Sequence, residues 1–419
     1  MSDTRTFPKK AWTLLVFIAG DNDLESFAHL DLMEMESLSS DEHVHVVVQF
    51  DSRAEATYRF RFFPGGHEVV GKPLDEVNTG DPAVLTQFVT WGKRHFPAEK
   101  TALVIWNHGT GLRKLPDDFD YSKLLRSGEV EVAQNELQRT LFSSTLSKLA
   151  QTRRRMRGVA IDATDRDYLD NEELQKALTD VPGDGPRVDL IGFDACLMSA
   201  VEIGYQLRDV ARFMVGSQEL EPGTGWPYAE ILNSLAANPS MTAREMAQMM
   251  VDSYIKAAGC RMRGHQSRYT QSAMDLGKVD QTLGLISELV NILLDTQVFN
   301  HSKVQRALRS SRTDVKRFHY RKTSKDRELA DLLDWCELLS RKTKGRAGNS
   351  FRDILYALQD HLAPGVGLVV TSRAYGGTDT SCIHGVSIYW PQKAYSSVYD
   401  GLDFAASNWG QLIKKVVGL

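Results

Sequence analysis

The stretch LIGFDACLM at residues 190–198, read together with IWNHG at residues 105–109, decides the predicted fold. Each is an apolar run that ends in a reactive side chain, Cys196 in the first and His108 in the second. In an α/β protein a short buried strand delivers the residues that follow it to the carboxyl edge of a parallel sheet. We therefore expect His108 and Cys196 at the same edge of one sheet.

Further strand patterns alternate with helical patterns along the first half of the chain. They lie at residues 12–19, 44–50, 58–63, 102–106, 158–161, 188–193 and 213–217. This alternation predicts an α/β fold, a mainly parallel sheet sandwiched by helices. From about Pro227 the pattern becomes mostly helical, and strand patterns return at 367–371 and 385–390. The sequence thus predicts a core over residues 1–226, a helical insertion over 227–364, and returning strands with a final helix over 365–419 that complete the core.

Composition is that of an ordinary globular protein. The chain has 419 residues, of which 42% are hydrophobic and 25% charged, enough for one large domain or two. A formal charge of −4 indicates no nucleic-acid or membrane partner. Four scattered cysteines without a C-x-x-C pair argue against zinc and against a disulfide framework. The apolar run near the start lacks a cleavage site and is far shorter than the ~20 residues of a membrane span, which predicts a cytoplasmic location.

Cys196 and His108 suggest nucleophilic catalysis, because an imidazole close in space can take the proton of a thiol. Gly109 would let a substrate carbonyl approach the backbone, and its N–H with that of Cys196 would form an oxyanion hole. A helix expected from about Ser199 to Val210 would place its positive end near the sulfur. The alternative is structural, since free cysteines are often buried and strand-end histidines are often only hydrogen-bonded.

Six segments together resemble the clostripain family of cysteine peptidases, family C11 of the caspase-like clan. They are IAGDNDLE (18–25), WNHG (106–109), DATDRDYLDNEEL (162–174), GFDACLMSAVE (192–202), GSQELEPGTGWPY (216–228) and HGVSIYWP (384–391). The resemblance implies a caspase-like fold, with His108 as general base and Cys196 as nucleophile. It also implies an endopeptidase that cuts protein or peptide substrates after arginine or lysine.

Asp194 stands two positions before Cys196, so both side chains would face the same side of the strand. A carboxylate at the base of a closed pocket selects a guanidinium or an ammonium group. The resemblance assigns the specificity acid to Asp194 and places Ser217 and Glu219 along the wall that receives the substrate backbone. Two alternatives stay open: Asp194 binds backbone N–H groups of the active-site loop, and Glu219 is either a second acidic contact or a surface residue.

The segment between Gly109 and Gly158 is polar and predicts an exposed loop. The resemblance implies a zymogen cut between the catalytic histidine and cysteine, by itself or by an upstream protease, with Lys123, Arg126, Arg139 or the basic run that begins at Arg153 as candidate sites. A solvated helix end would explain that basic run equally well. A regulated intracellular protease of bacterial defence or cell death would suit such an architecture.

The acidic segment at 162–173 raises the hypothesis of a calcium ion held by Asp162, Asp165 and Asp167, since some relatives need that ion and hard cations want several oxygen ligands. A helix start capped by Asp170 would explain the same acids without metal, and no cofactor is expected to be required. The alternative function is a catalytically silent or regulatory peptide-binding protein. A nucleotide-binding domain is disfavoured, because neither a Walker loop nor a G-x-G-x-x-G follows a strand.

Overall fold

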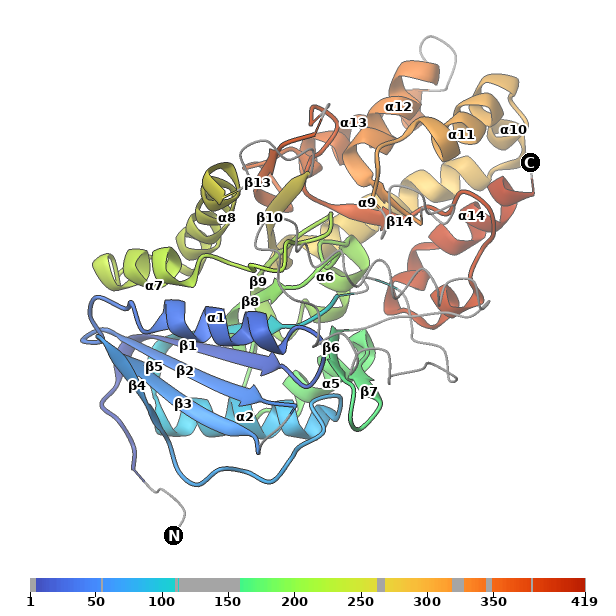
Figure 1. The fold of residues 1–419 in the computed structure, drawn as a ribbon. Helices are drawn as coiled ribbons and strands as arrows, with labels where there is room; N and C mark the ends of the chain where they lie inside the picture. Colours follow the sequence, from blue (N-terminus) through green and yellow to red (C-terminus); the bar gives the residue numbers. More distant parts are fainter. Residues whose placement is uncertain are drawn as a thin grey trace.

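A nine-stranded sheet forms the centre of the computed structural model (Figure 1), in the strand order β13-β10-β9-β8-β5-β1-β2-β3-β4. The structure describes residues 5–53, 56–109, 112, 159–261, 268–318, 328–343, 349–377 and 380–418. The five middle strands are parallel; they are β1 (Lys10–Ala19), β2 (Val44–Asp51), β5 (Ala98–Trp106), β8 (Val188–Asp194) and β9 (Ala211–Gly216). Their apolar runs are buried on both faces, as parallel strands require.

Antiparallel strands complete the sheet at both edges. They are β3 (Tyr58–Phe63) and β4 (Gly66–Val69) at one edge, and β10 (Tyr269–Asp275) and β13 (Val369–Tyr375) at the other. The predicted α/β class with a mainly parallel sheet is confirmed.

Helices cover both faces of the sheet, as Figure 1 shows for α1 and α2 on opposite sides. One face packs against α1 (Glu25–Met35), α7 (Tyr228–Ala237) and α8 (Ala243–Arg261). The other packs against α2 (Pro82–His95), α5 (Asn171–Thr179), α6 (Val201–Leu207) and α9 (Val279–Leu294). Within β1, Leu14 and Val16 point to the first layer while Leu15 and Phe17 point to the second, so alternate residues of one strand belong to two cores.

The C-terminal part adds helices and a small sheet beside α9. The helices are α10 (Thr296–Phe299), α11 (Ser302–Asp314), α12 (Leu332–Thr343), α13 (Asn349–Leu362) and α14 (Trp409–Val417). The small sheet consists of β11 (Arg317–Phe318), β12 (Leu329–Asp331) and β14 (Ser387–Tyr389). Trp335, Trp390 and Trp409 pack with ring centroids 4.9–5.3 Å apart and join α12, α14 and the end of β14. Among the described residues, none of the helices combines the length and the apolar character needed to span a bilayer.

Three expectations about the strands differ from the structure. The segment 227–364 is not wholly helical, because its strand β10 lies inside the main sheet between β9 and β13. The strand predicted at 158–161 is β6 (Val159–Asp162), which pairs with β7 (Asp167–Leu169) outside the main sheet. The two returning strands, β13 and β14, belong to different sheets.

The start of α5 carries the expected cap. The Asp170 carboxylate accepts the N–H groups of Glu172 (2.9 Å) and Glu173 (2.8 Å), and Glu173 in turn accepts the N–H of Asp170. We predict that Asp170→Ala lowers the free energy of unfolding by about 1 kcal/mol, measured by urea denaturation. Asp184→Ala, which removes an exposed carboxylate from a loop, should leave the midpoint unchanged. Equal losses in the two variants would contradict a specific capping role.

Candidate active site

His108 and Cys196 follow neighbouring strands at the same edge of the sheet. In the parallel register of β5 and β8, Trp106 lies opposite Asp194, so the residues two positions further on, His108 and Cys196, extend side by side. The contact is close, since a Cβ built on Gly109 would lie 2.2 Å from the carbonyl oxygen of Cys196 and 2.8 Å from its nitrogen. The expectation of a shared edge is confirmed, and glycine at position 109 is what permits the approach.

Asp23, which lies in the segment IAGDNDLE and was given no catalytic role from the sequence, completes this pair. Nε2 of His108 lies 2.7 Å from Oδ1 of Asp23, and the two side chains are 1% and 5% exposed. Asp23 belongs to the turn between β1 and α1, and β1 is the strand next to β5. A carboxylate that accepts Nε2–H orients the ring and leaves Nδ1 as the basic nitrogen. The signal in the sequence was a third strand end at the same edge, the one in IAGDNDLE.

The thiol of Cys196 is enclosed, with 5% of the residue exposed. Its Sγ accepts the N–H of Glu221 at 3.1 Å. Leu197 takes a left-handed conformation (φ 64°) and donates its N–H to the carbonyl of Glu219 at 3.2 Å, so the chain turns sharply after the nucleophile. Helix α6 begins only at Val201, two residues later than predicted, and the Glu221 N–H donates a hydrogen bond to the sulfur.

Apolar side chains pack around this thiol. They are Leu197, Phe318, Leu329 and Ile383. Phe318 and Leu329 come from the small sheet, so the C-terminal part of the chain contributes one wall of the site.

Asp194 is fully buried, on the side of the sheet that faces α7. Its Oδ2 accepts the N–H of Trp226 at 3.2 Å and the hydroxyl proton of Tyr228 at 3.0 Å. This geometry agrees with the alternative in which Asp194 binds the backbone of the site loop, because the fully buried carboxylate accepts the Trp226 N–H.

Ser217 and Glu219 also differ from expectation. Ser217 is fully buried, and its hydroxyl lies 2.9 Å from the Thr270 hydroxyl and 3.0 Å from the Glu219 carbonyl. Glu219 forms an ion pair with Arg268 at 3.0 Å, and burial raises the pKa of its carboxyl although Arg268 lies beside it. Both side chains point to partners within the chain, because Thr270 and Arg268 belong to β10 and its approach, which the sequence analysis did not place in the sheet.

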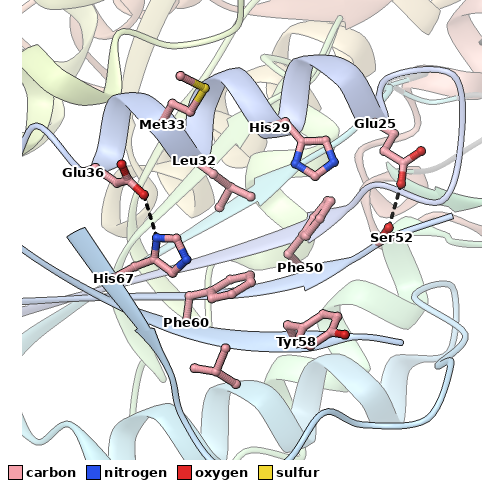
Figure 2. A pocket seen from close by; sticks show the side chains of 11 residues that line it. Glu25, His29, Leu32, Met33, Glu36, Phe50, Ser52, Tyr58, Phe60 and His67 are labelled. Atoms are coloured by element: carbon pink, nitrogen blue, oxygen red, sulfur yellow. Dashed lines mark hydrogen bonds and ion pairs between the residues drawn. The ribbon is translucent and has the colours of Figure 1, made fainter. Parts of the chain in front are cut away.

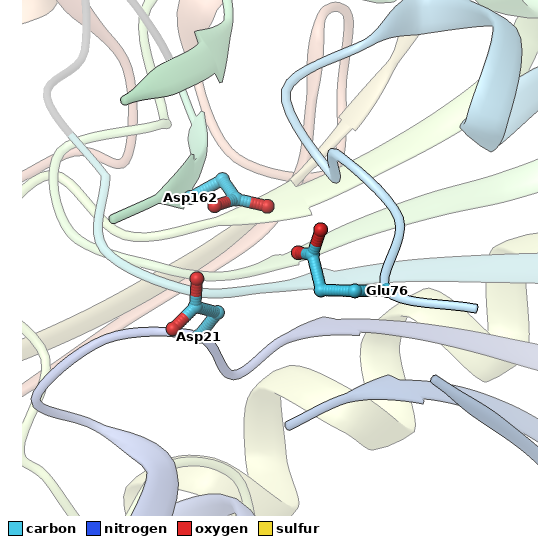
Figure 3. Close-up of side chains that lie close together, drawn as sticks. All are labelled: Asp21, Glu76 and Asp162. Atoms are coloured by element: carbon cyan, nitrogen blue, oxygen red, sulfur yellow. The ribbon is translucent and has the colours of Figure 1, made fainter. Parts of the chain in front are cut away.

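The three acids predicted to hold calcium do not form one cluster by themselves. Asp162 instead clusters with Asp21 and Glu76, and one oxygen of each of these three residues lies within 4.8 Å of the others. Figure 3 shows these three carboxylates turned toward one another. The Asp167 carboxylate instead accepts Asn78 Nδ2–H at 2.7 Å, and Asp165 donates its backbone N–H to Asp162 at 2.9 Å. Asp21 and Glu76 were missed, because they are 55 and more residues apart in sequence from each other and from Asp162.

A surface pocket lies elsewhere, between α1 and the β3–β4 hairpin (Figure 2). Its apolar floor includes Phe50 and Phe60, and His67 bonds to Glu36 at its rim at 2.7 Å. None of the residues that line it belongs to the His108–Cys196 pair.

The candidate processing residues lie outside the described residues. They are Lys123, Arg126, Arg139 and Arg153.

Known proteins similar to this chain share both the sequence pattern and the architecture. A family model described as the clostripain family, Peptidase_C11, matches residues 16–124 and 147–414. Clostripain from Hathewaya histolytica is 27% identical over 174 residues, which is 39% of this chain and only 26% of that protein. The alignment therefore spans about a quarter of the curated relative.

Solved structures extend the similarity over the whole fold. A secreted C11 cysteine protease from Bacteroides thetaiotaomicron, in complex with an irreversible peptide inhibitor, superposes with a TM-score of 0.66 at 19% identity, covering 96% of this chain and 99% of that one. An inactive zymogen C11 protease from Parabacteroides distasonis gives a TM-score of 0.63 at 19% identity with the same coverage. At these identities the likeness shows the fold, a caspase-like sheet flanked by helices.

The contact at Gly109 gives a stability prediction. Gly109→Ala should lower the thermal unfolding temperature, because the new methyl group would overlap the Cys196 backbone. The matched change Gly284→Ala, in the exposed face of α9 where a Cβ meets nothing within 4 Å, should raise it slightly through helix propensity. Differential scanning calorimetry of both variants measures whether each unfolding temperature falls or rises. A Gly109→Ala protein as stable as the wild type would mean that the two strand ends do not touch.

Proposed function

Because this chain belongs to the clostripain family of cysteine peptidases, we propose that it is an endopeptidase in which Cys196 is the nucleophile and His108 the general acid–base. The observation that carries the proposal is the contact between the ends of β5 and β8, which holds both reactive side chains at one edge with Gly109 against the Cys196 backbone.

The proposed reaction is an acyl transfer in two steps. The Cys196 sulfur attacks the peptide carbonyl carbon, the C–N bond breaks, and His108 gives a proton to the leaving amine. Water then attacks the thioester, His108 takes its proton, and the acid product leaves with the thiol restored. Backbone N–H groups at Gly109 and Cys196 would stabilise the oxyanion, a role typically worth about 3 kcal/mol per donor. Asp23 is a positioning residue that holds the imidazole.

Cleavage after arginine or lysine, with Asp194 as the selecting acid, is part of the proposal. The support is a buried carboxylate two residues before the nucleophile, whose Oδ2 already accepts two hydrogen bonds from the segment that contains Trp226 and Tyr228. A substrate guanidinium would have to displace part of this segment in order to reach the carboxylate, because Asp194 is fully buried. An arginine would then replace neutral donors with a charge-assisted pair.

Activation by cleavage between residues 112 and 157 fits this enclosed site. A thiol that is 5% exposed and a covered Asp194 suit an inactive precursor, and a cut after Lys123, Arg126, Arg139 or Arg153 would release the segment that joins His108 to the second half of the core. We propose that the chain, or an upstream protease with the same preference for basic residues, makes this cut.

The decisive change is Cys196→Ala. We predict that wild-type protein, once cut in the loop, hydrolyses fluorogenic peptides after Arg or Lys and that Cys196→Ala abolishes this, while Cys260→Ala, which removes an exposed thiol on α8, retains the wild-type rate. Intact mass of each protein records the cut. Turnover only after Asp would contradict the role of Asp194, and silence of the cut wild-type protein would favour the peptide-binding alternative.

The Asp23–His108 contact gives a kinetic prediction. Asp23→Asn should lower kcat by about 10²- to 10⁴-fold with little change in KM, because an amide no longer stabilises the imidazolium or holds the productive tautomer. Steady-state kinetics on the cut enzyme measure the two constants, with Asp184→Asn as the exposed control. A rise in KM at constant kcat would instead assign Asp23 to substrate binding.

A further inference from the structure

The pocket between α1 and the β3–β4 hairpin has the size and the lining of a binding site (Figure 2). Its volume is about 640 Å³, within the range of roughly 300–1,000 Å³ that is common for ligand pockets. Phe50 and Phe60 form the floor, and Leu32 of α1 lies above them. Met33 and Val69 also line the pocket and are 65% and 43% exposed, so apolar surface stays open to solvent. Exposed apolar surface beside a hollow indicates a place where another molecule binds.

The charged groups at the two ends of this pocket are acidic. Glu25, at the start of α1, accepts the Ser52 hydroxyl at 2.7 Å and the backbone N–H of Arg53 at 3.0 Å. Both donors are neutral, so the carboxylate keeps its negative charge. Glu36, at the other end of α1, contacts Nδ1 of His67 at 2.7 Å. None of the described residues that line the pocket is a lysine or an arginine. Acidic ends around an aromatic floor favour a ligand that is apolar and positively charged.

The pocket begins at the turn that holds the catalytic imidazole. Asp23 contacts His108, and Glu25 follows Asp23 by two residues as the first residue of α1. Ser52 directly follows the carboxyl end of β2. Helix α1 then continues for 11 residues, which corresponds to about 16 Å. The pocket therefore starts at the edge of the sheet that carries His108 and extends away from it along α1.

The strand order shows which part of a substrate would lie on this side. Cys196 follows β8, and on one side of β8 the next strand is β9, which precedes Glu219. On the other side follow β5 with His108, then β1, β2 and β3, where the pocket lies. In the proposed reaction the acyl part stays on the sulfur, and His108 gives its proton to the leaving amine. The residues after the scissile bond therefore lie on the side of His108 and of the pocket, an assignment that rests on the proposed function.

We propose that this pocket binds the part of a protein substrate that follows the scissile bond, through one basic and one apolar side chain. The ammonium or guanidinium group lies at Glu25, and the apolar side chain lies on Phe50 and Phe60. Three strand spacings of about 4.8 Å separate β5 from β3, roughly 14 Å, which about four extended residues span. The contacts thus begin about five residues after the scissile bond, and a short fluorogenic peptide does not reach them.

Binding is tested by isothermal titration calorimetry on the full-length Cys196→Ala protein, which cannot cut the peptide. The probe stands for the leaving part of a substrate: a Gly/Ser peptide of about ten residues with a Lys-Leu pair at its fifth and sixth positions. We expect saturable binding, and about tenfold weaker binding of the matched Glu-Leu peptide, which is the effect of one charge-assisted contact.

Two variants place an ammonium group in the pocket from opposite walls. His29→Lys puts it one helical turn from Glu25, where the two side chains pair, and Val69→Lys puts it on β4. Each should weaken binding of the Lys-Leu peptide about tenfold. Leu30→Lys makes the same change at an exposed position of α1 that does not line the pocket, and it should bind the peptide as the parent protein does.

The kinetic test uses cut enzyme with an intact Cys196 and two long substrates that share one scissile arginine. They carry D-Lys-Leu or D-Glu-Leu at the fifth and sixth positions after the bond, because a D-residue offers no second bond to cut. The D-Lys substrate should have about tenfold higher kcat/KM, mainly through a lower KM. This ratio should fall to about one in His29→Lys and persist in Leu30→Lys.

Equal binding of the Lys-Leu and Glu-Leu peptides would overturn the proposal, and so would unchanged binding in both pocket variants. Free tryptamine that binds as tightly as the peptide would assign the pocket to a small amine instead. A dimer in sedimentation that His29→Lys dissociates would assign it to a second copy of the chain. A cut wild-type enzyme that cleaves neither substrate would contradict the proposed function, whereas selective binding of the Lys-Leu peptide would still support the pocket.

Discussion

The parallel pairing of β5 with β8 is the constraint on which the site depends. Its register sets His108 beside Cys196, and the absence of a side chain at Gly109 lets the two strand ends meet. The neighbouring strands bring the remaining parts, because the sheet order β9-β8-β5-β1 places the segments with Glu221, Cys196, His108 and Asp23 next to one another. Four segments of the site are thus arranged by backbone pairing before any side chain contributes.

The parts of this arrangement that could be predicted from the sequence are those with a local pattern of apolar residues. Strands buried on both faces read as apolar runs, which is why β1, β2, β5, β8 and β9 and the shared edge could be located. Strand β10 was not predicted because its residues Thr270, Gln271 and Ser272 are polar. Their burial is tolerable because they form hydrogen bonds with residues distant in sequence, which are Ser217, Glu221 and Ser199. A pattern read along the chain contains no sign of such partners.

The same limit explains the individual site residues. Asp23 lies at a plausible helix start, where an acidic residue is common for local reasons. Nothing in its position therefore indicated its partner His108, which is 85 residues away. Asp162 was recognised as acidic, but its neighbours Asp21 and Glu76 are brought to it only by tertiary structure. Asp194, Ser217 and Glu219 were placed near the nucleophile, and what could not be foreseen was the extent to which other segments cover them.

The boundary between β5 and β8 divides the sheet into an N-terminal and a C-terminal half. The strands on one side of the β5–β8 boundary, β1 to β5, all precede residue 109, and those on the other side, β8, β9, β10 and β13, all follow residue 159. A single break between those residues would turn one polypeptide into a heterodimer whose subunits share one seam across the sheet. His108 would belong to one subunit and Cys196 to the other, each useless alone. No peptide bond would then join the two strands. The affinity of the two subunits for each other would determine how long His108 and Cys196 stay together.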